Sequence, residues 1–378
     1  VGAVIAGPAF CATLDAVRSE LPVPADRFIV LADDAPAGWR TYEDLMAGAA
    51  DNGRFATVLP EDMVALMYTS GTTGRPKGAI RSHGGSTLIA LATALEMGFI
   101  RDDTALLVMP LCHANSLYFG STFVHLGATV IIDDRPSFDP EALLRTLAED
   151  RVTFTSLVPT HYIMMLSLPP EVKARYDLSA VGKLMISSAP ARQDTKRGIM
   201  ELFPNGKLHE LYGSTEAGWV TLLRPDEQLR KLGSVGREWA GSGPIRLLDH
   251  ERREVPDGEV GELFSRTAYV FDGYWRDPEK TAEAMDGLWC SVGDMARRDE
   301  EGYIWLVDRK SNMIISGGEN AYPSEVEGVL GAHPKVQDVA VIGVPHEKWG
   351  ESPLAVVVLH AGQCATEAEL RDWCRERL

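Results

Sequence analysis

The chain has 378 residues, of which 45% are hydrophobic and 24% charged, a composition typical of a globular protein with two or more domains. Its formal net charge of −17 argues against a nucleic-acid surface, because phosphate backbones select basic patches. The five cysteines form no Cys-x-x-Cys pair, so they support neither a disulfide framework nor a zinc site and favour the reducing cytoplasm.

The first 60 residues carry no motif. Their pattern predicts short apolar strands at residues 1–6 and 28–31 and a helix over residues 10–21. No apolar run in the chain approaches the roughly 20 residues that span a bilayer, and no signal peptide opens it. Since Val1 lies inside an apolar segment without an initiating Met, we expect part of the first domain to be missing before it.

At residue 68 an apolar run gives way to a polar loop. Residues 63–67 predict a buried strand, which is followed by the sequence Tyr68-Thr69-Ser70-Gly71-Thr72-Thr73-Gly74-Arg75-Pro76-Lys77-Gly78. Glycines let backbone N–H groups form a concave nest, and hydroxyls and Lys77 add donors and positive charge, so this loop suits a phosphate. It is not a Walker A loop, since Pro76 replaces a required Gly and Gly78 follows Lys77. A solvated turn is the alternative.

Strands and helices then alternate, which predicts a largely parallel sheet covered on both faces, with ligands at the carboxyl ends of its strands. A helix over residues 140–150 should be capped by Asp139. The expected strands are residues 106–109, 128–132, 154–158 and 184–186.

After residue 204 short glycine-punctuated strands, such as residues 244–248 and 260–264, predict a smaller sheet. A polar break near Ser311 predicts a domain boundary, which gives domains of residues 1–310 and 311–378. The second domain should contain a capping box at residues 324–327, strands at 339–344 and 354–359, and a last helix after a capping box at 366–369.

Three motifs in order identify a family resemblance. The loop Thr69-Ser70-Gly71-Thr72-Thr73-Gly74-Arg75-Pro76-Lys77-Gly78, the stretch Glu210-Leu211-Tyr212-Gly213-Ser214-Thr215-Glu216 and the stretch Ser316-Gly317-Gly318-Glu319-Asn320-Ala321-Tyr322-Pro323 resemble the adenylate-forming superfamily. This superfamily contains acyl-CoA synthetases, aryl-CoA ligases, luciferases and peptide-synthetase adenylation domains, and the resemblance covers essentially the whole chain. It implies an α/β fold: a large N-terminal domain of doubly wound mixed sheets with a small β-rich subdomain, then a small mobile α+β C-terminal domain.

The resemblance also implies a nucleotide site. Thr215 would donate to a phosphate, Glu216 would bind Mg²⁺, and Tyr212 would stack on adenine. The phosphates of ATP would be held by Thr69, Ser70, Gly71, Thr72, Thr73, Gly74 and Lys77. The adenine and ribose would be held by Ser188, Ala189, Pro190, Glu210, Tyr212, Gly213, Asp294 and Arg309. Read singly, these residues would more often belong to turns, capped loops and surface ion pairs.

The acid and the thiol would bind nearby. By resemblance, His113 lines the pocket of the carboxylate, and Gly317 and Gly318 let the backbone enter a narrow tunnel beside coenzyme A. Cys112 and His113 are adjacent, and neighbours on an extended segment point apart, so they are badly placed to act as a thiol nucleophile and its base. A structural histidine is the alternative for His113.

Three departures from the family pattern stand out. Ser311 and Asn312 occupy hinge positions where relatives commonly have Lys or Asp and then Asp, and His346 stands where an Asp is usual. Relatives also carry a C-terminal lysine that contacts the carboxylate and α-phosphate, whereas this chain stops before it. If Leu378 is the true end, the first half-reaction should be severely impaired.

The expected function is an ATP-dependent, AMP-forming ligase that converts a fatty, aryl or alicyclic acid to an acyl-adenylate and then to a coenzyme A thioester. Catalysis would rest on Lys77, Thr215, Glu216 and His113. Two alternatives are an adenylation enzyme that loads a carrier protein and a binding module that holds nucleotide without turnover. The oligomeric state is left open, a homodimer being one option.

Overall fold

The computed structural model describes residues 2–50, 53, 56–69, 76–316, 319–346 and 348–378. The chain divides into two compact units, residues 1–57 and 58–378. In the first unit β1 (Val4–Ala6), β2 (Phe28–Val30) and β3 (Arg40–Thr41) form a parallel sheet with α1 (Cys11–Val17) and α2 (Tyr42–Ala47). Its core is built from Cys11, Phe28, Val30 and Trp39.

The predicted helix over residues 10–21 is shorter than expected. Only Cys11–Val17 is α-helical, and short 3₁₀ turns at Pro8–Phe10 and Arg18–Glu20 flank it. Pro22 explains why no helical turn continues past Glu20, because the residue before a proline is driven out of the helical region, and Leu21 has φ −86° and ψ 129°.

The second unit is organised around a mixed sheet. Its described strands run in the order β12-β11-β10-β9-β8-β6-β7, parallel from β10 to β7 and antiparallel where β11 and β12 join. The strands are β6 (Thr104–Leu107), β7 (Thr129–Ile132), β8 (Phe154–Leu157), β9 (Lys183–Ser187), β10 (Lys207–Ser214), β11 (Gly218–Leu223) and β12 (Arg237–Glu238). The four predicted strands of this sheet are confirmed, with ends shifted by one or two residues.

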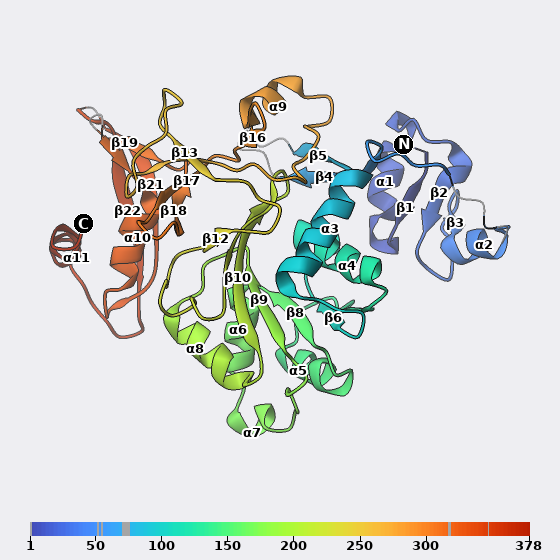
Figure 1. Cartoon of the computed structure of the whole chain (residues 1–378), viewed down its shortest axis with the longest axis horizontal. Coiled ribbons are helices and arrows are strands. Elements are labelled where there is room, and N and C mark those ends of the chain that lie inside the picture. Colours follow the sequence, from blue (N-terminus) through green and yellow to red (C-terminus); the bar gives the residue numbers. More distant parts are fainter. Residues whose placement is uncertain (1, 51–52, 54–55, 70–75, 317–318, 347) are drawn as a thin grey trace. The chain divides into compact units, whose positions relative to one another are not determined.

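Alternate residues of these strands enter two separate cores, as the period of a strand requires. Leu107 and Met185 pack with α3 (His83–Met97) and α4 (Ala114–Leu126), whereas Leu106 and Ile186 pack on the other face. That face is covered by α5 (Pro140–Glu149), α6 (Pro159–Leu166) and α8 (Gln193–Leu202), with α7 (Pro170–Lys173) beyond (Figure 1). The predicted doubly wound sheet, with helices on both faces, is therefore confirmed. The predicted helix cap is also confirmed, since Asp139 Oδ1 accepts from Glu141 N and Ala142 N.

The strand before the polar loop differs from its prediction. β4 (Met63–Thr69) pairs antiparallel with β5 (Lys77–Ser82) in a separate two-stranded sheet, and of its residues Met63 and Val64 are about half exposed while Met67 is buried. The expectation of a buried strand was wrong because only one face of this ribbon packs against the large core, through Met67.

The smaller sheet predicted after residue 204 is present. β13 (Arg246–Leu248), β14 (Gly261–Phe264), β17 (Asp294–Arg298) and β18 (Ile304–Arg309) are antiparallel neighbours around a core of Val235, Ile245, Leu247, Leu263, Ala296 and Ile304. The segment of the chain between β14 and β17 contains α9 (Pro278–Ala284), β15 (Met285–Asp286) and β16 (Trp289–Cys290).

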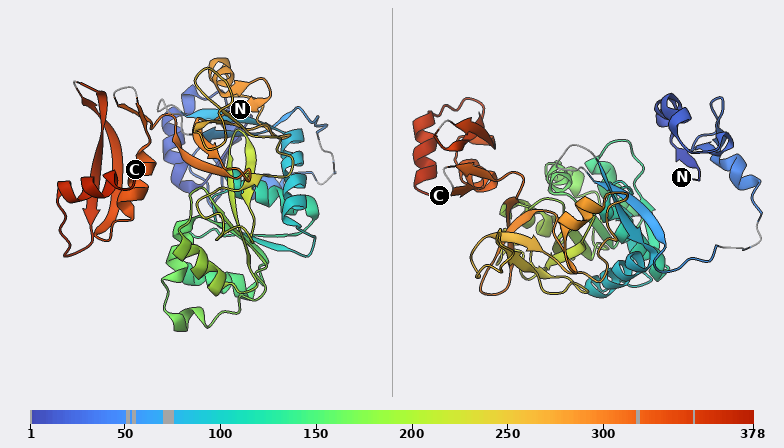
Figure 2. Two further views of the ribbon diagram at one scale, coloured as in Figure 1. Left: turned by 60° about the vertical axis from the view of Figure 1, so that its left-hand side comes forward. Right: turned by 90° about the horizontal axis from the view of Figure 1, so that it is seen from above.

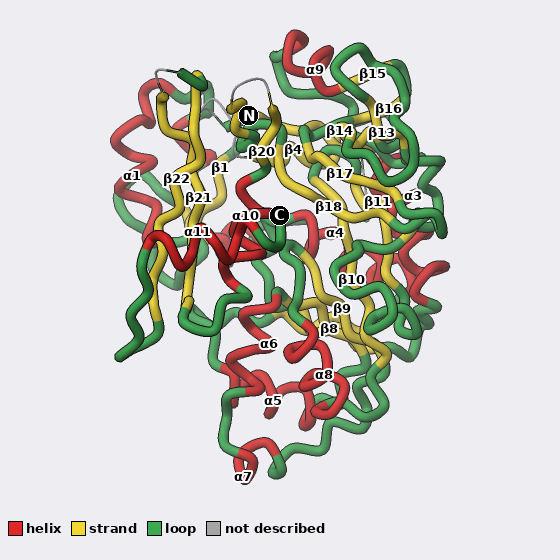
Figure 3. The backbone as a smooth tube through the Cα atoms, turned by 90° about the vertical axis from the view of Figure 1, so that its left-hand side faces the viewer, coloured by secondary structure: helices red, strands yellow, loops and turns green. Residues whose placement is uncertain are grey.

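The last part of the chain pairs two long strands, β21 (Val336–His346) and β22 (Gly350–Leu359), with β19 (Ile314–Ser316) and β20 (Glu319–Ala321) (Figures 2 and 3). This part of the chain also contains two helices, α10 (Pro323–Gly331) and α11 (Glu367–Arg375). Thr366 caps α11 as predicted, since its hydroxyl accepts from Glu369 N across 3.2 Å. Among the described residues, no helix is both long and apolar enough to cross a bilayer.

The capping box predicted at residues 324–327 was wrong. The helix begins one residue earlier, at Pro323, whose fixed φ suits a first helical position. Ser324 therefore lies inside the first turn, where its hydroxyl donates to Val307 O, and Glu327 Oε1 accepts from Val341 N across 2.8 Å. Both side chains join the helix to neighbouring strands instead of closing its end.

Candidate active site

Four polar side chains from distant parts of the sequence converge at the ends of β4 and β5. The Thr69 hydroxyl donates to Glu216 Oε1 across 3.3 Å, and the Tyr274 hydroxyl donates to the same oxygen across 2.7 Å. Lys77 Nζ donates to the Tyr274 hydroxyl across 3.2 Å and lies 4.3 Å from the centre of its ring. Burial, followed by the Glu216 carboxylate, raises the pKa of Tyr274, so its phenol is neutral and donates.

Strand register brings these residues together. Thr69 ends β4, Lys77 begins β5, and the antiparallel pairing places them directly opposite each other. Glu216 lies in the turn between β10 and β11, and its carbonyl accepts from Phe271 N across 2.7 Å. Sequence reasoning assigned Thr69, Lys77 and Glu216 to the phosphates and metal, but it missed Tyr274.

Glu216 has the surroundings of a cation ligand. Its side chain is 5% exposed, and Thr69 and Tyr274 both contact its Oε1 with neutral hydroxyls. Among the described residues, no Lys or Arg forms an ion pair with it. A buried carboxylate without a counter-charge is costly, and Mg²⁺ prefers oxygen ligands, so Oε2 fits a hard divalent cation.

A second cluster lies on the β17–β18 hairpin. Tyr212 Oη donates to Asp294 Oδ2 across 2.6 Å, and Arg309 Nε lies 3.4 Å from Asp294 Oδ1. Asp294 and Arg309 are directly opposite in the register of β17 and β18. Burial, reinforced by Asp294, raises the pKa of Tyr212 well above its usual range, so its phenol stays a neutral donor. The orientation of Asp294 is thus fixed from two sides, as suits a carboxylate that accepts from vicinal ribose hydroxyls.

Gly213 lies at a bulge between these clusters. The register of β10 against β11 shifts between Tyr212 and Gly213, and a Cβ atom on Gly213 would lie 2.3 Å from the carbonyl oxygen of Gly218. Only glycine fits there. Thr215 follows in the turn, and its carbonyl accepts from the Tyr118 hydroxyl across 3.4 Å.

Arg81 supports the same turn, and sequence reasoning missed it because one Arg in a strand usually faces solvent. Its side chain is 1% exposed. The guanidinium donates to Glu216 O across 3.2 Å, to Thr215 O across 3.4 Å and to Tyr269 O across 2.6 Å. The charge is spread over backbone carbonyls, so it fixes the turn without forming an ion pair with the Glu216 carboxylate.

The residues expected around the adenine and the acid follow the carboxyl ends of strands. Ser188, Ala189 and Pro190 come directly after β9 and are exposed, and Ser188 has φ +69°. His113 is exposed at the start of α4. Two residues later Asn115 is 7% exposed, and its amide nitrogen donates to Ser156 Oγ and Ser187 Oγ, both across 2.8 Å. Sequence reasoning did not single out Asn115, whose buried amide joins α4 to β8 and β9.

Glu210 lies apart from these clusters. Its carboxylate is 3% exposed and pairs with Lys196 of α8, which is 0% exposed. Burial raises the pKa of Glu210, and Lys196 opposes that shift. The geometry thus shows a contact between sheet and helix, while nucleotide contact by Glu210 stays a prediction.

Seven of the predicted site residues lie outside the described residues. They are Ser70, Gly71, Thr72, Thr73, Gly74, Gly317 and Gly318. Their roles stay predictions.

The sequence of the chain is similar to the sequences of known proteins. The sequence profile described as "AMP-binding enzyme" matches residues 3–275, and the one described as "AMP-binding enzyme C-terminal domain" matches residues 325–378. An indoleacetate–CoA ligase of Aromatoleum aromaticum is 36% identical over 359 residues, which cover 93% of this chain and 68% of that protein. A feruloyl-CoA synthase of an Amycolatopsis species is 40% identical over 323 residues, covering 84% of this chain and 64% of its own length.

A solved structure matches the whole chain. The amide bond synthetase McbA of Marinactinospora thermotolerans superposes with a TM-score of 0.85 at 28% identity, covering 100% of this chain and 74% of its own. The chain thus spans about two thirds to three quarters of the length of these proteins.

Proposed function

Since the chain belongs to the AMP-binding enzyme family within the adenylate-forming superfamily, we propose that it is an AMP-forming acyl-CoA synthetase for an aromatic carboxylic acid. The family's reaction has two steps. The carboxylate oxygen attacks the α-phosphorus of ATP, which releases pyrophosphate and leaves an acyl-adenylate, and the thiol of coenzyme A then displaces AMP to form the thioester. Activation is needed because a free carboxylate has no good leaving group.

The convergence of Thr69, Lys77, Tyr274 and Glu216 carries this proposal. Lys77 provides positive charge for a departing pyrophosphate, and Thr69 provides a hydroxyl donor beside it. Mg²⁺, when bound by Glu216, would neutralise phosphate charge. No protein nucleophile is required.

The ribose end of the nucleotide belongs to the second cluster. Asp294, fixed by Tyr212 and Arg309, would accept from the ribose hydroxyls, while Ser188, Ala189 and Pro190 would flank the adenine. His113 would face the reacting carboxylate. These roles, with Thr215 as a phosphate donor, extend the interpretation of the motifs to the geometry of the two clusters.

The aromatic class of the acid rests on the relatives, of which one is named for indoleacetate and one for ferulate. A fatty acid is the alternative, because a medium/long-chain-fatty-acid–CoA ligase of Mycobacterium tuberculosis is 34% identical over 364 residues. The structural likeness to an amide bond synthetase makes an amine a second candidate acceptor in place of the thiol. An enzyme that loads a carrier protein and a module that binds nucleotide without turnover are competing assignments.

The proposal includes a division at residues 310 and 311, with rotation of the C-terminal part about Ser311 and Asn312. Two hydrogen bonds to the carboxylate of Asp308 cross this division, from Asn312 Nδ2 across 3.1 Å and from Ser324 N across 3.0 Å, so rotation would have to break them. We also propose that the protein is cytoplasmic and forms a homodimer. Sedimentation velocity tests the homodimer.

Carboxylate-dependent ATP–pyrophosphate exchange tests the function, run with a panel of aromatic, fatty and alicyclic acids on the 378-residue chain and on the protein at its natural length. Exchange with aromatic acids, followed by loss of free thiol when coenzyme A is added, supports the proposal. Exchange with fatty acids alone overturns the aromatic class. Nucleotide binding without exchange by either protein overturns the ligase, and consumption of an amine in place of the thiol reassigns the acceptor.

A further inference from the structure

The cluster of Thr69, Lys77, Glu216 and Tyr274, called the phosphate cluster below, contains one residue to which neither the motifs nor the family reaction assigns a role. Tyr274 is 5% exposed and is the only member of the cluster that contacts both charged side chains, within the part of the chain that the structure describes. Its hydroxyl accepts from Lys77 Nζ across 3.2 Å and donates to Glu216 Oε1 across 2.7 Å. A neutral group therefore stands between an ammonium and a carboxylate that would otherwise attract each other.

The backbone holds Tyr274 on the strand that carries Lys77. Tyr274 forms an antiparallel bridge with Ala79, Trp275 N donates to Gly78 O across 2.7 Å, and Ile80 N donates to the carbonyl of residue 273 across 2.9 Å. Residues 273–275 thus pair with β5 through an isolated antiparallel bridge, which places the ring of Tyr274 beside Lys77.

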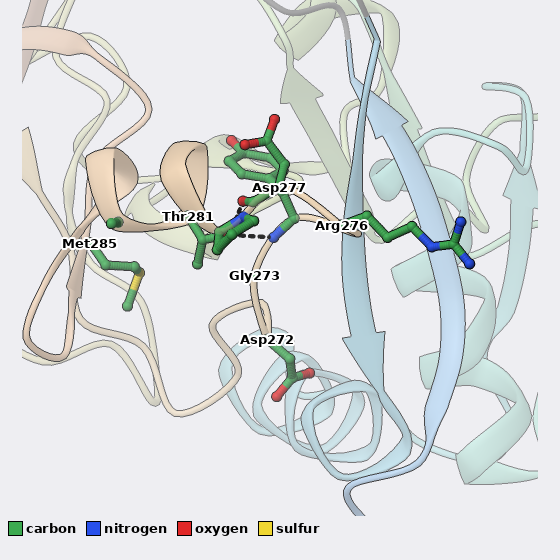
Figure 4. Close-up of a pocket in the computed structure, with 9 residues that line it drawn as sticks. Asp272, Gly273, Arg276, Asp277, Thr281 and Met285 are labelled. Carbon is green, nitrogen blue, oxygen red and sulfur yellow. Dashed lines mark hydrogen bonds between the residues drawn. The ribbon is translucent and has the colours of Figure 1, made fainter.

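A second anchor lies behind the tyrosine. Thr281 Oγ1 accepts from Tyr274 N across 2.8 Å and donates to Asp277 O, also across 2.8 Å. These residues border a pocket of about 500 Å³, where Figure 4 shows Thr281 beside Asp277 and the side chains of Asp272 and Arg276 pointing away from them. The backbone of Tyr274 is thus held by Thr281, while the Asp277 carboxylate accepts from Lys280 N across 3.0 Å at the start of α9.

We propose that Tyr274 is a positioning residue, whose hydroxyl keeps Lys77 and Glu216 apart and so reserves the ammonium for phosphate and the carboxylate for Mg²⁺. The inference rests on the proposed function. A direct ion pair between Lys77 and Glu216 would neutralise both groups in a site with little water, and MgATP would then have to break that pair in order to bind. The hydroxyl bridge leaves Glu216 Oε2 available to the cation.

Tyr274→Phe isolates the hydroxyl, because the ring keeps its packing against Phe271, whose ring centre lies 4.9 Å away. We expect the affinity for MgATP, measured by isothermal titration calorimetry, to fall about tenfold or more, as loss of a hydrogen bond to a charged group does. The affinity for AMP should stay within about twofold, since AMP lacks the two phosphates near Lys77. The Mg²⁺ concentration that gives half-maximal ATP–pyrophosphate exchange should rise in parallel.

Tyr162→Phe is the matched control. Tyr162 is 0% exposed, and its hydroxyl donates to Met185 O across 3.1 Å and contacts neither Lys77 nor Glu216, so its loss should lower the melting temperature without changing either affinity. If Tyr274→Phe fails to fold, Thr281→Val removes the anchor of Tyr274 N with little change in shape, and it should weaken MgATP binding in the same direction.

The outcomes separate this inference from the proposed function. Unchanged MgATP affinity in Tyr274→Phe, with AMP and MgATP bound by the wild type, overturns the role of Tyr274 alone. An equal loss of AMP and MgATP affinity also overturns it, because it indicates a general structural defect. A wild-type protein that binds neither nucleotide overturns the proposed function itself.

Discussion

Two buried glutamates six positions apart differ in how their charge is balanced. Glu210, within β10, is paired with the equally buried Lys196, so the protein supplies its own counter-charge. Glu216, just after β10, receives only the hydroxyls of Thr69 and Tyr274 among the described side chains. Both carboxylates have similar exposure, so this difference is the one expected between a charge that stabilises the fold and a charge that, under the proposed function, binds a ligand.

The largest effect should come from removing the counter-charge of Glu210. Lys196→Met leaves a buried carboxylate unpaired, which we expect to lower the free energy of unfolding by about 3–5 kcal/mol, measured by urea denaturation. Arg371→Met, which breaks an exposed pair with Glu367, should cost less than about 1 kcal/mol. A loss of similar size in both variants would show that Lys196 does not stabilise the fold through Glu210.

The opposite pattern is expected at Glu216. Glu216→Gln keeps the shape and the two hydroxyl contacts, so the melting temperature should hold while ATP–pyrophosphate exchange falls about 100-fold or more. The control is Glu227→Gln, which removes a charge that is 3% exposed and bonded to Tyr303 and Arg237. That variant should lose stability and keep exchange; exchange retained by Glu216→Gln would end its assignment to the metal.

A smaller effect is expected at the second cluster, in which Tyr212 and Arg309 contact Asp294. Tyr212→Phe removes the donor at 2.6 Å from Asp294 and leaves the ring in place. We expect AMP affinity to fall about tenfold, as measured by calorimetry. Tyr162→Phe loses a buried hydroxyl that bonds to Met185 O, and it should leave AMP affinity unchanged. Equal AMP affinities in the wild type and Tyr212→Phe would show that AMP binding does not require this hydroxyl to orient Asp294.

The smallest effect concerns a third acid, Asp103, which is balanced by a mixture of charge and neutral donors. Burial opposes its ionisation, but hydrogen bonds from Ile100 N, Thr153 and Lys183 outweigh burial and hold its pKa below the usual 3.8. A lowered folded-state pKa adds stability above the unfolded-state value, and this is lost as the pH falls through the folded-state value.

Asp103→Asn should therefore lower stability by about 1 kcal/mol at neutral pH, because the ion pair that is lost involves Lys183, whose side chain is partly exposed and screened by solvent. The difference from the wild type should shrink as the pH falls below 3.8. Urea midpoints recorded between about pH 7 and pH 3 check this. A difference that grows on acidification would show that the sign is wrong.

The sequence predicted four strands of the large sheet from alternation, and it predicted Thr69, Lys77 and Glu216 from two local motifs. It did not predict Tyr274 or Arg81, whose roles depend on contacts with segments far away in the chain. Glu210 illustrates the same limit. Glu210 lies in a recognised motif, but Lys196, which pairs with its carboxylate, lies on a helix that no sequence pattern links to that motif.

The errors in secondary structure share a physical cause. Ser324 and Glu327 have the spacing of a capping box, yet their side chains bond to Val307 and Val341 because Pro323 already begins the helix. The exposed outer part of β4 has the apolar sequence of a buried strand. In both places the local pattern is genuine, and contacts with distant residues decided the outcome.

The bulge at Gly213 has a consequence for protein engineering. In a library that randomises residues 210–216, selection at most positions can favour one side chain over another for its chemistry, because those positions have room for a side chain. Position 213 will report only on sterics, since the first atom of any side chain would overlap the carbonyl oxygen of Gly218 at 2.3 Å. Selection for a new acid should therefore return a single codon family there, whatever the substrate, and this invariance provides an internal standard for the quality of the library.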